Sequence, residues 1–352
     1  VGENPSLIKG LDKERMVRNI TFENVDVFLI DIGLPDGNGI ELYQELQMEK
    51  RIPAIFLTAR DEEKEMLLAF DAGAQDYVVK PFSMKVLMKR LEVASKICND
   101  ASPVQVEGPI HVGVDLGTAD VVVMAVDDNG MPVSAFLEWA TVVRDGVVVD
   151  YHGAITIVKR LVSMTEERLG RKITEASTSY PPGTDARLST NILDAANLRL
   201  VNTADEPSCL ARLARLDRAA VVDIGGGTTG TAVISNGKVI ASVDDATGGH
   251  HVTLAMSGAL SVPYEEAELK KRGTDNRQYA PIVKPVFERI SDIVKAHISG
   301  HAVDTVYLSG GTCCFPGIAP LFEKELGIKV ECPDYPLLLT PLAIACLPLM
   351  EG

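Results

Sequence analysis

The sequence predicts an α/β protein of two parts, and three observations lead to this prediction. Residues 1–100 alternate short apolar strands with helix-like segments. The following part contains one strand–turn–strand pattern twice, as VGVDLGTADVVVMAVDDNG and VVDIGGGTTGTAVISNG. A further apolar strand, in VDTVYLSGGTCCFPG, ends in a Gly-Gly turn before a helix. The composition, with 46% hydrophobic and 24% charged residues, is that of an ordinary globular protein.

Residues 1–100 form the first predicted domain. Its strands and helices alternate, which is typical of a parallel sheet. We expect strands at residues 25–31, 54–58 and 76–79, and helices at residues 39–49, 61–72 and 83–96. The stretch NDASPVQVEGP, in which Pro103 and Pro109 enclose small and polar residues, predicts a linker. The predicted domains are therefore residues 1–100 and 110–352, joined by a linker at residues 101–109.

Each copy of the repeat places an aspartate near the end of an apolar strand, Asp115 in the first and Asp223 in the second. A turn of glycine and threonine follows, and an Asn-Gly pair ends the returning strand, as in β-hairpins. Glycine lets the backbone approach phosphate oxygens, threonine hydroxyls add donors, and an aspartate can orient Mg²⁺ through its water shell. Two such turns could hold a nucleotide's phosphates from both sides. For either turn alone, a wide hairpin turn without a ligand is the alternative.

The third motif lies at the end of the strand in VDTVYLSGGT, at Ser309-Gly310-Gly311-Thr312. A helix is expected from about Gly317 to Leu326. A Gly-Gly turn at the head of a helix allows a flat ring or a sugar to approach the backbone closely. The alternative is a tight strand–helix turn with no ligand.

These three motifs, in this order, resemble the superfamily of actin, sugar kinases and DnaK-type chaperone ATPases. GVDLGTA (113–119) is similar to its first phosphate motif, DIGGGTT (223–229) to its second, and LSGGT (308–312) to its adenosine motif. The resemblance implies an actin-like ATPase core of two ribonuclease-H-like lobes over residues 110–352. Within the superfamily, VEGPIHVGVDLGTA, SYPPGT and DDATGGHHVTLAMSG most resemble EutJ-type chaperone-like proteins of ethanolamine utilisation.

The resemblance gives each motif residue a role. Asp115 and Asp223 would orient hydrated Mg²⁺, and Glu206, in DEPSCL, would help to polarise the attacking water. Gly310 and Gly311 would flank the adenosine of ATP. The residues expected to hold the phosphates are Gly117, Thr118, Gly225, Gly226, Gly227 and Thr228.

Two positions leave the mechanism open. Lys159, in VKRL, lies where DnaK-type proteins carry a catalytic lysine, but a single basic residue on an amphipathic helix is also typical of a solvated face. DnaK-type proteins have a further aspartate two places after the motif threonine, where this chain has Gly230. A missing ligand of the Mg²⁺ shell argues against fast hydrolysis more than against binding. We therefore expect ATP and Mg²⁺ to bind, and any ATPase activity to be slow.

The amino-terminal part resembles a bacterial response-regulator receiver domain, which has a flavodoxin-like fold. The motifs are VDVFLIDIGLPD, FLTAR and YVVKPF, and the resemblance implies a phosphoacceptor at Asp31 with Thr58 and Lys80 binding the phosphoryl group. Glu3 and Asp31 are too close in sequence for the usual helix, strand and second helix between them. We therefore interpret residues 1–100 as a shortened receiver, and a strand-capping role for Asp31 is the alternative.

Charge and cysteine content exclude several classes of function. A net charge of −15 disfavours a direct grip on nucleic acid or on an anionic membrane. The six cysteines form no C-x-x-C pair, which predicts reduced thiols. Charged residues or glycine interrupt every apolar run before it could span a bilayer. We therefore expect a cytoplasmic protein.

The resemblance implies an ATP-binding, chaperone-like protein whose cleft grips and releases a client as nucleotide binds and leaves. The client would be an ethanolamine-metabolising enzyme or a microcompartment protein. Two other classes stay open: an actin-like filament or scaffold protein, and a signalling ATPase regulated by the receiver-like domain. A sugar kinase is disfavoured, because no separate catalytic base has a convincing motif. The sequence leaves the oligomeric state open.

Overall fold

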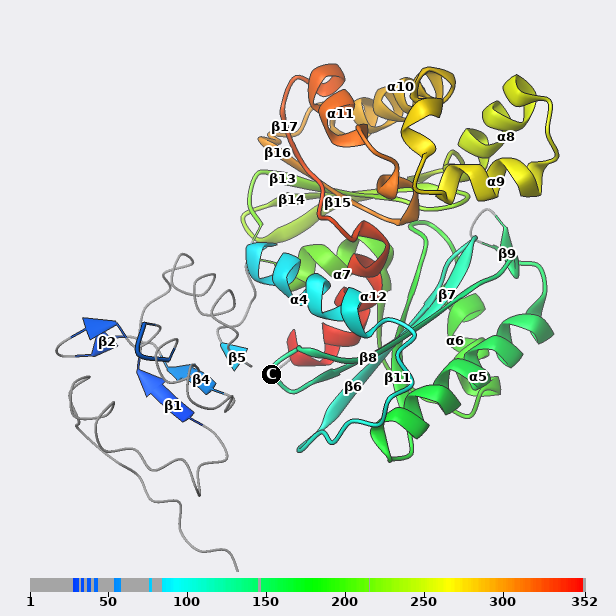
Figure 1. Ribbon diagram of the computed structural model, residues 1–352. Helices are drawn as coiled ribbons and strands as arrows, with labels where there is room; N and C mark the ends of the chain where they lie inside the picture. Colours follow the sequence, from blue (N-terminus) through cyan, green and yellow to red (C-terminus); the bar gives the residue numbers. More distant parts are fainter. Residues whose placement is uncertain are drawn as a thin grey trace, which may run out of the picture. The chain divides into compact units, whose positions relative to one another are not determined.

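The computed structural model describes residues 28–31, 33–34, 37–38, 41–43, 54–57, 76–77, 84–144, 147–214 and 216–350. The chain divides into two compact units, Val1–Lys89 and Arg90–Gly352. Each unit has its own sheets (Figure 1). The division falls within helix α4 (Met84–Ile97), which matches the helix predicted at residues 83–96.

The first unit contains a parallel sheet in the order β1-β4-β5. Its strands are β1 (Phe28–Asp31), β4 (Ala54–Leu57) and β5 (Asp76–Tyr77). All three lie within the predicted strands, so the parallel sheet is confirmed. A short hairpin of β2 (Gly33–Leu34) and β3 (Gly37–Asn38) follows β1. The helix predicted at residues 61–72 lies outside the described residues.

The second unit begins with a lobe built on a five-stranded sheet in the order β12-β11-β6-β7-β8. The strands are β6 (Ile110–Leu116), β7 (Asp120–Asp127), β8 (Pro132–Trp139), β11 (Glu175–Tyr180) and β12 (Arg199–Asp205). The first three pair antiparallel, and β11 and β12 join them in parallel. Helices α5 (Tyr151–Leu169) and α6 (Arg187–Ala195) pack on this sheet, and β9 (Val143–Arg144) and β10 (Val147–Val148) form a small hairpin.

The second lobe repeats this arrangement with the strand order β15-β14-β13-β16-β17. The strands are β13 (Ala219–Ile224), β14 (Thr229–Ser235), β15 (Lys238–Asp245), β16 (Thr305–Ser309) and β17 (Lys329–Glu331). Its helices are α8 (Gly249–Leu260), α9 (Tyr264–Arg272), α10 (Ala280–Ile298) and α11 (Ile318–Leu326). In both lobes a three-stranded meander is extended by two parallel strands, which confirms the two ribonuclease-H-like lobes that the resemblance implied.

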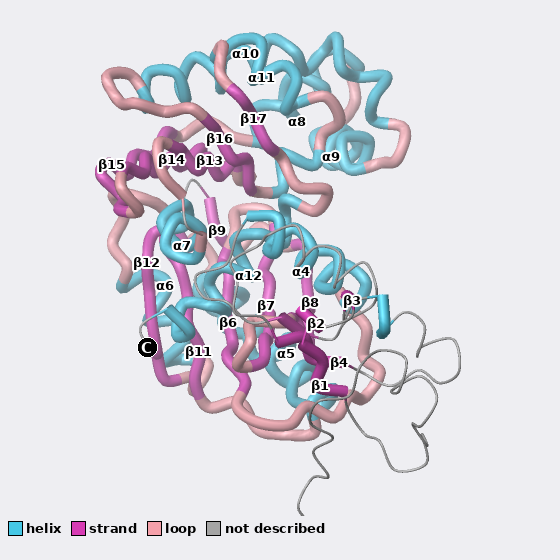
Figure 2. The backbone as a smooth tube through the Cα atoms, turned by 90° about the vertical axis from the view of Figure 1, so that its left-hand side faces the viewer, coloured by secondary structure: helices cyan, strands magenta, loops and turns pink. Residues whose placement is uncertain are grey.

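Two helices lie between the sheets of the two lobes: α7 (Glu206–Leu213) and α12 (Leu339–Cys346) (Figure 2). Helix α7 packs on β13, β14 and β15, and α12 packs on β6 and on α7. Every residue of α12 is buried, in accordance with its sequence LTPLAIAC, which contains no charged residue. Helix α12, close to the carboxyl end of the described residues, therefore packs on the sheet of the first lobe.

The segment at residues 101–109 has no regular secondary structure, as the two prolines predict. Two arginines at the end of α5 and just after it hold its backbone. Arg168 donates to the carbonyl oxygens of Asp100 and Ser102 at 2.9 and 2.7 Å, and Arg171 donates to the carbonyl of Gly108 at 2.7 Å. The segment is therefore packed along the first lobe.

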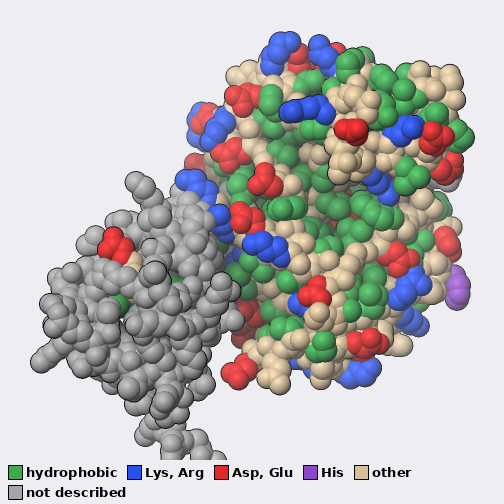
Figure 3. Space-filling model, in the orientation of Figure 1, with side chains coloured by type: hydrophobic (Ala, Val, Ile, Leu, Met, Phe, Trp, Pro, Cys, Tyr) green, Lys and Arg blue, Asp and Glu red, His purple; other side chains and the backbone are tan. Residues whose placement is uncertain are grey.

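Charged side chains of both signs are scattered over the face of the second unit that Figure 3 shows. Lys and Arg side chains alternate there with Asp and Glu and do not gather over one element. None of the helices in the described part of the chain is long and apolar enough to cross a bilayer.

Candidate functional site

The two glycine-threonine turns of the repeat face each other across a cleft between the lobes. The turn between β6 and β7 carries Gly117 and Thr118, and the turn between β13 and β14 carries Gly225 to Thr228. A Cβ atom added to Gly226 would lie 3.1 Å from the Cβ of Ala119 and 3.2 Å from that of Thr118. The turns therefore touch, and Gly226 cannot carry a side chain without pushing them apart.

The second turn is held in place by hydrogen bonds that its carbonyl groups accept. The carbonyl of Gly225 accepts hydrogen bonds from the N–H of Gly249 at 2.9 Å and from Oγ1 of Thr312 at 2.7 Å. The carbonyl of Gly226 accepts from the N–H of His250 at 2.7 Å. Because the start of α8 and the third motif both bind this turn, its conformation is set by two segments that are distant in the sequence.

Three carboxylates lie behind the turns. Asp115 and Asp223 are buried near the ends of β6 and β13, and Glu206 is the first residue of α7. Burial raises the pKa of Asp115 well above its usual range, and the nearby charges of Asp120 and Asp223 raise it further. The pKa of Glu206 is also raised well above its usual range, by burial and then by Asp223 and Asp115. These groups are costly to ionise together, and a bound cation would offset that cost.

Asp223 is held in place by a hydrogen bond from helix α12. Oγ1 of Thr340, in α12, donates a hydrogen bond to Oδ2 of Asp223, and it lies 2.9 Å from Oγ of Ser309. Gly310 packs directly beside this carboxylate, because an added Cβ would lie 2.5 Å from Oδ1 of Asp223. Its φ of +91° is also one that a side chain would disfavour. The third motif, at Gly310, is therefore in close contact with the second motif, at Asp223.

The cleft encloses about 830 Å³ when the part open to solvent is counted. Most of the residues predicted from the motifs line it. They are Asp115, Gly117, Thr118, Glu206, Asp223, Gly225, Gly226, Thr228, Gly310 and Gly311.

Two predicted residues do not line the cleft. Gly227 belongs to the second turn but is not among the lining residues. Lys159 lies on the exposed side of α5, because Ala154, Val158 and Leu161 of this helix are buried against the first lobe. The structure thus does not bring Lys159 to the carboxylates.

Several lining residues were not found from the sequence. Asp120 lies at the start of β7, one residue after the quoted first motif, and is 8% exposed. Trp139 ends β8, and the cleft is also lined by Glu268, Lys271 and Arg272 of α9. The sequence of α9, YEEAELKKR, is typical of a solvated helix, so no local signal pointed to a site.

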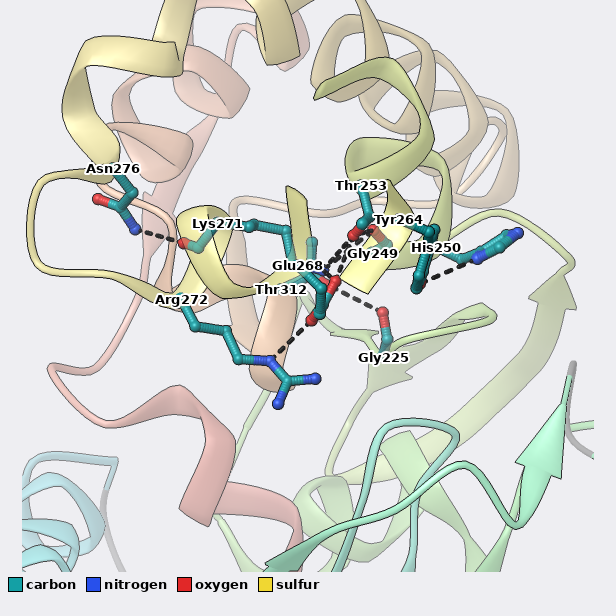
Figure 4. A network of polar contacts seen from close by, with 10 residues as sticks. All are labelled: Gly225, Gly249, His250, Thr253, Tyr264, Glu268, Lys271, Arg272, Asn276 and Thr312. Atoms are coloured by element: carbon teal, nitrogen blue, oxygen red, sulfur yellow. Dashed lines mark hydrogen bonds and ion pairs between the residues drawn. The ribbon is translucent and has the colours of Figure 1, made fainter. Parts of the chain in front are cut away.

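The residues from α9 form a connected polar network (Figure 4). Nζ of Lys271 donates to Oγ1 of Thr253 at 2.8 Å and to the carbonyl of Gly249 at 3.1 Å. Glu268 pairs with Lys271 at 2.7 Å and with Arg272 at 2.7 Å. Because Gly249 also binds the second turn, this network joins the basic residues of the cleft to the turn.

The donor set fits a hydrated Mg²⁺ better than a fully protein-bound metal. Among the residues that the structure describes, no three acid, histidine or cysteine side chains gather as direct ligands of a metal ion. Mg²⁺ is commonly held by one or two carboxylates together with water and substrate phosphates. Asp115 and Asp223 could serve as such carboxylates.

In the first unit, the structure places Asp31 as the last residue of β1, beside Leu57 of the parallel strand β4. The carboxyl ends of parallel strands are where an open α/β sheet binds its ligand. Thr58 and Lys80 lie outside the described residues.

Similar proteins match most of the length of this chain. The ethanolamine utilization protein EutJ of Escherichia coli (strain K12) is 49% identical over 260 residues, which are 74% of this chain and 93% of that protein. The chain belongs to the EutJ family. A crystal structure of EutJ from Carboxydothermus hydrogenoformans matches with a TM-score of 0.70 at 41% identity, over 74% of this chain and 98% of that one.

Two further matches agree with the fold of this EutJ-family chain. Residues 161–335 match the family of the type IV pilus assembly protein PilM. MreB5 of Spiroplasma citri, in a crystal structure bound to AMPPNP, has a TM-score of 0.53 at 16% identity, over 68% of this chain and 95% of that one. At that identity the likeness shows the actin-like fold alone. Residues 9–92 match the response regulator receiver domain.

Proposed function

We propose that this chain is an ATP-binding, chaperone-like protein of ethanolamine utilisation, with a cleft that closes on Mg·ATP. The observation that carries the proposal is the contact of the two glycine-threonine turns at Gly226 and Thr118, with Asp115 and Asp223 behind them. Paired backbone turns and a carboxylate on each side suit a polyphosphate with its hydrated cation. Each lobe supplies one turn and one carboxylate, so the ligand would bridge the lobes.

The residues of the cleft would act mainly by binding and orientation. Mg²⁺, when bound, would neutralise phosphate charge and orient water. The Gly310–Gly311 turn and the network of Glu268 and Lys271 line the same cleft as the second turn, and the nucleoside would lie against them. Burial and the acidic neighbours of Glu206 raise its pKa, and a nearby positive charge would favour the ionised carboxylate that accepts a proton from water. This supports binding with slow hydrolysis rather than fast turnover.

Nucleotide would then shift the population of open and closed clefts. A ligand that contacts both turns binds the closed form more tightly and favours it. A client that prefers one form would be gripped or released as nucleotide binds or leaves. Because the relatives are ethanolamine utilization proteins, the proposed client is an enzyme of ethanolamine metabolism or a microcompartment protein.

Isothermal titration calorimetry of Mg·ATP tests this function, with phosphate release followed in parallel. We expect Asp223→Ala to weaken binding by about tenfold or more, about 1.4 kcal/mol. The matched control is Asp292→Ala, because Asp292 is an exposed aspartate of α10 in the same lobe. Folded protein that binds no Mg·ATP would overturn the proposal. Sedimentation of polymer upon addition of Mg·ATP would instead favour the filament or scaffold class.

A receiver-linked role is a second proposal, and it rests on the position of Asp31 at the carboxyl end of β1 and on the receiver match of residues 9–92. In this alternative, phosphorylation of Asp31 would change nucleotide binding by the EutJ-like part. Intact mass after incubation with acetyl phosphate and Mg²⁺ should show one added phosphoryl group, and Asp31→Asn should not gain it. Unchanged mass in both proteins, or unchanged nucleotide affinity after phosphorylation, would contradict it.

A further inference from the structure

One row of residues crosses the sheet of the second lobe beside the cleft. Asp223 of β13 lies opposite Gly230 of β14, and Gly230 lies opposite Asp244 of β15. Residues directly opposite each other on neighbouring strands project from the same face of a sheet. Asp223 lines the cleft, and Asp244, which is not itself among the lining residues, projects from the same face of the sheet. The position between the two carboxylates has no side chain, because it is Gly230. DnaK-type proteins carry a further aspartate at this place in the motif.

The carboxylate of Asp244 has spare capacity to accept hydrogen bonds. Its Oδ1 atom is buried and has no hydrogen-bond partner among the described residues. The side chain of Thr228, in the second turn, is within hydrogen-bonding reach of the same carboxylate. A buried acceptor without a partner is costly, and such groups often mark a place where water or a ligand binds.

Asp244 interacts electrostatically with two other carboxylates of the cleft, Asp223 and Glu206. Burial raises the pKa of Asp244 to about 7, and the charge of Asp223 adds to that rise. The charge of Asp244 in turn contributes to the raised pKa of Glu206. Asp244 therefore belongs electrostatically to the same group as the carboxylates at the end of the two turns.

Two prolines, Pro182 and Pro207, lie over Gly230. A Cβ atom added to Gly230 would lie 3.4 Å from Cδ of Pro182 and 3.4 Å from Cδ of Pro207. Pro207 directly follows Glu206 at the start of α7. The bare position between Asp223 and Asp244 thus lies under the helix that carries Glu206.

We propose that Asp244 is a positioning residue of the nucleotide site, whose carboxylate accepts hydrogen bonds from the water shell of a nucleotide-bound Mg²⁺. Bound Mg²⁺ keeps several waters, and each of them is a hydrogen-bond donor. An ionised carboxylate only accepts, so its free oxygen matches those donors. Asp244 would thereby supply from β15 the carboxylate that Gly230 cannot supply from β14. The inference rests on the proposed function.

The chain offers a matched control in Asp245. This neighbour carries the same charge on the same strand, lies opposite Thr229 rather than Gly230, and projects from the other face. Its Oδ1 already accepts a hydrogen bond from Oγ1 of Thr247 at 2.8 Å. Asp244→Asn and Asp245→Asn therefore remove the same charge from nearly the same place, and only the first removes the proposed acceptor.

Calorimetry of ATP binding with Mg²⁺ and with EDTA measures how much Mg²⁺ tightens binding. We expect Asp244→Asn to reduce this gain about tenfold, equal to about 1.4 kcal/mol, while binding in EDTA is unchanged or slightly tighter. Asp245→Asn should leave the gain as in the wild type. Equal gains in the two variants would overturn the role of Asp244 while leaving the nucleotide site intact. Wild-type protein that binds no ATP in either buffer would overturn the proposed function and this inference together.

A second variant moves the carboxylate back to β14. The Cβ of an aspartate at position 230 meets only ordinary van der Waals contacts, and Gly230 does not have a positive φ. We expect Gly230→Asp combined with Asp244→Asn to recover most of the Mg²⁺-dependent gain. Thermal unfolding followed by circular dichroism confirms that each variant is folded. A folded double variant that recovers none of the gain would contradict a shared role for the two positions.

Discussion

The guanidinium carbon of Arg272 lies 3.8 Å from the centre of the Trp139 ring, and the two residues belong to opposite lobes. Both line the cleft, and half of the surface of Trp139 is exposed, at 49%. Arg272 is also held by Glu268 of its own helix at 2.7 Å. This stacking contact therefore joins the lobes at the edge of the cleft, in a geometry where a cation is attracted to the face of the indole.

A double-mutant cycle on Arg272→Ala and Trp139→Ala should give a coupling free energy of about 0.5–1 kcal/mol, the range for a partly exposed cation–π pair. The free energy of unfolding is best followed in urea by circular dichroism, because Trp139 is the sole tryptophan of the chain. Lys284→Ala provides the control, since Lys284 pairs with Glu288 on α10 and does not line the cleft. Its effect should add to that of Trp139→Ala. Additive effects for the Arg272 pair would show that the contact contributes nothing.

Gly226→Ala should lower the free energy of unfolding by about 1 kcal/mol or more, because the new methyl group would lie against Thr118 and Ala119 of the opposite turn. It should also weaken Mg·ATP binding, since the turns could no longer meet. Gly258→Ala is the control: it lies exposed in α8 with no atom within 4 Å of its added Cβ. That change should stabilise the helix by about 0.5–1 kcal/mol. Urea unfolding of both variants measures the contrast, and equal stabilities would contradict the contact between the turns.

The motif residues could be predicted from the sequence because each motif is local. Asp115 and Asp223 both lie near the end of an apolar strand, directly ahead of a glycine-threonine turn, and strand ends position such groups without help from distant residues. The repeat predicted the two β-hairpins for the same reason, whereas the two lobes were implied by the resemblance. The contact between the two turns needed only the pairing of the two lobes, which the resemblance supplied.

The other cleft residues depend on packing between distant segments. Thr340 reaches Asp223 across 117 positions, and its own sequence, LLLTPLA, is that of a buried helix. Lys271 and Arg272 reach the cleft because α9 packs on α8. The periodicity of YEEAELKKR does not predict this packing. Lys159 shows the converse. The resemblance offered it as a cleft residue, with a solvated face as the alternative, but α5 buries its apolar face and leaves Lys159 exposed.

Thr340→Val should lower the free energy of unfolding by about 1–3 kcal/mol, because the buried Oδ2 of Asp223 would lose its donor while the side chain keeps its shape. Thr340→Ser keeps the hydroxyl and removes only a methyl group, so its cost should be about 0.8 kcal/mol or less. Urea unfolding of both variants in the absence of nucleotide gives the comparison. Equal losses for valine and serine would mean that the methyl group, not the hydrogen bond, carries the stabilisation.

The stability of the protein should depend on pH through Asp120. Burial raises the pKa of this carboxyl group to about 7, with Arg272 opposing the rise and Asp223 adding to it. An aspartate in the unfolded chain titrates near pH 4. The folded state therefore binds the proton more tightly, so the contribution of Asp120 to stability is complete below about pH 4 and is lost as the pH rises to about 7.

Asp120→Asn removes this dependence, because asparagine stays neutral in both states. The variant should therefore gain more stability over the wild type at pH 8 than at pH 5, as thermal unfolding at the two pH values would measure. Asp185→Asn serves as the control, since hydrogen bonds from Arg187 lower the pKa of this exposed carboxyl group. The contribution of Asp185 to stability is lost only as the pH falls below the usual aspartate range. Asp185→Asn should therefore change the stability by the same amount at pH 5 and at pH 8. An equal effect of Asp120→Asn at both values would show that Asp120 ionises freely, and that the cleft is more solvated than its burial implies.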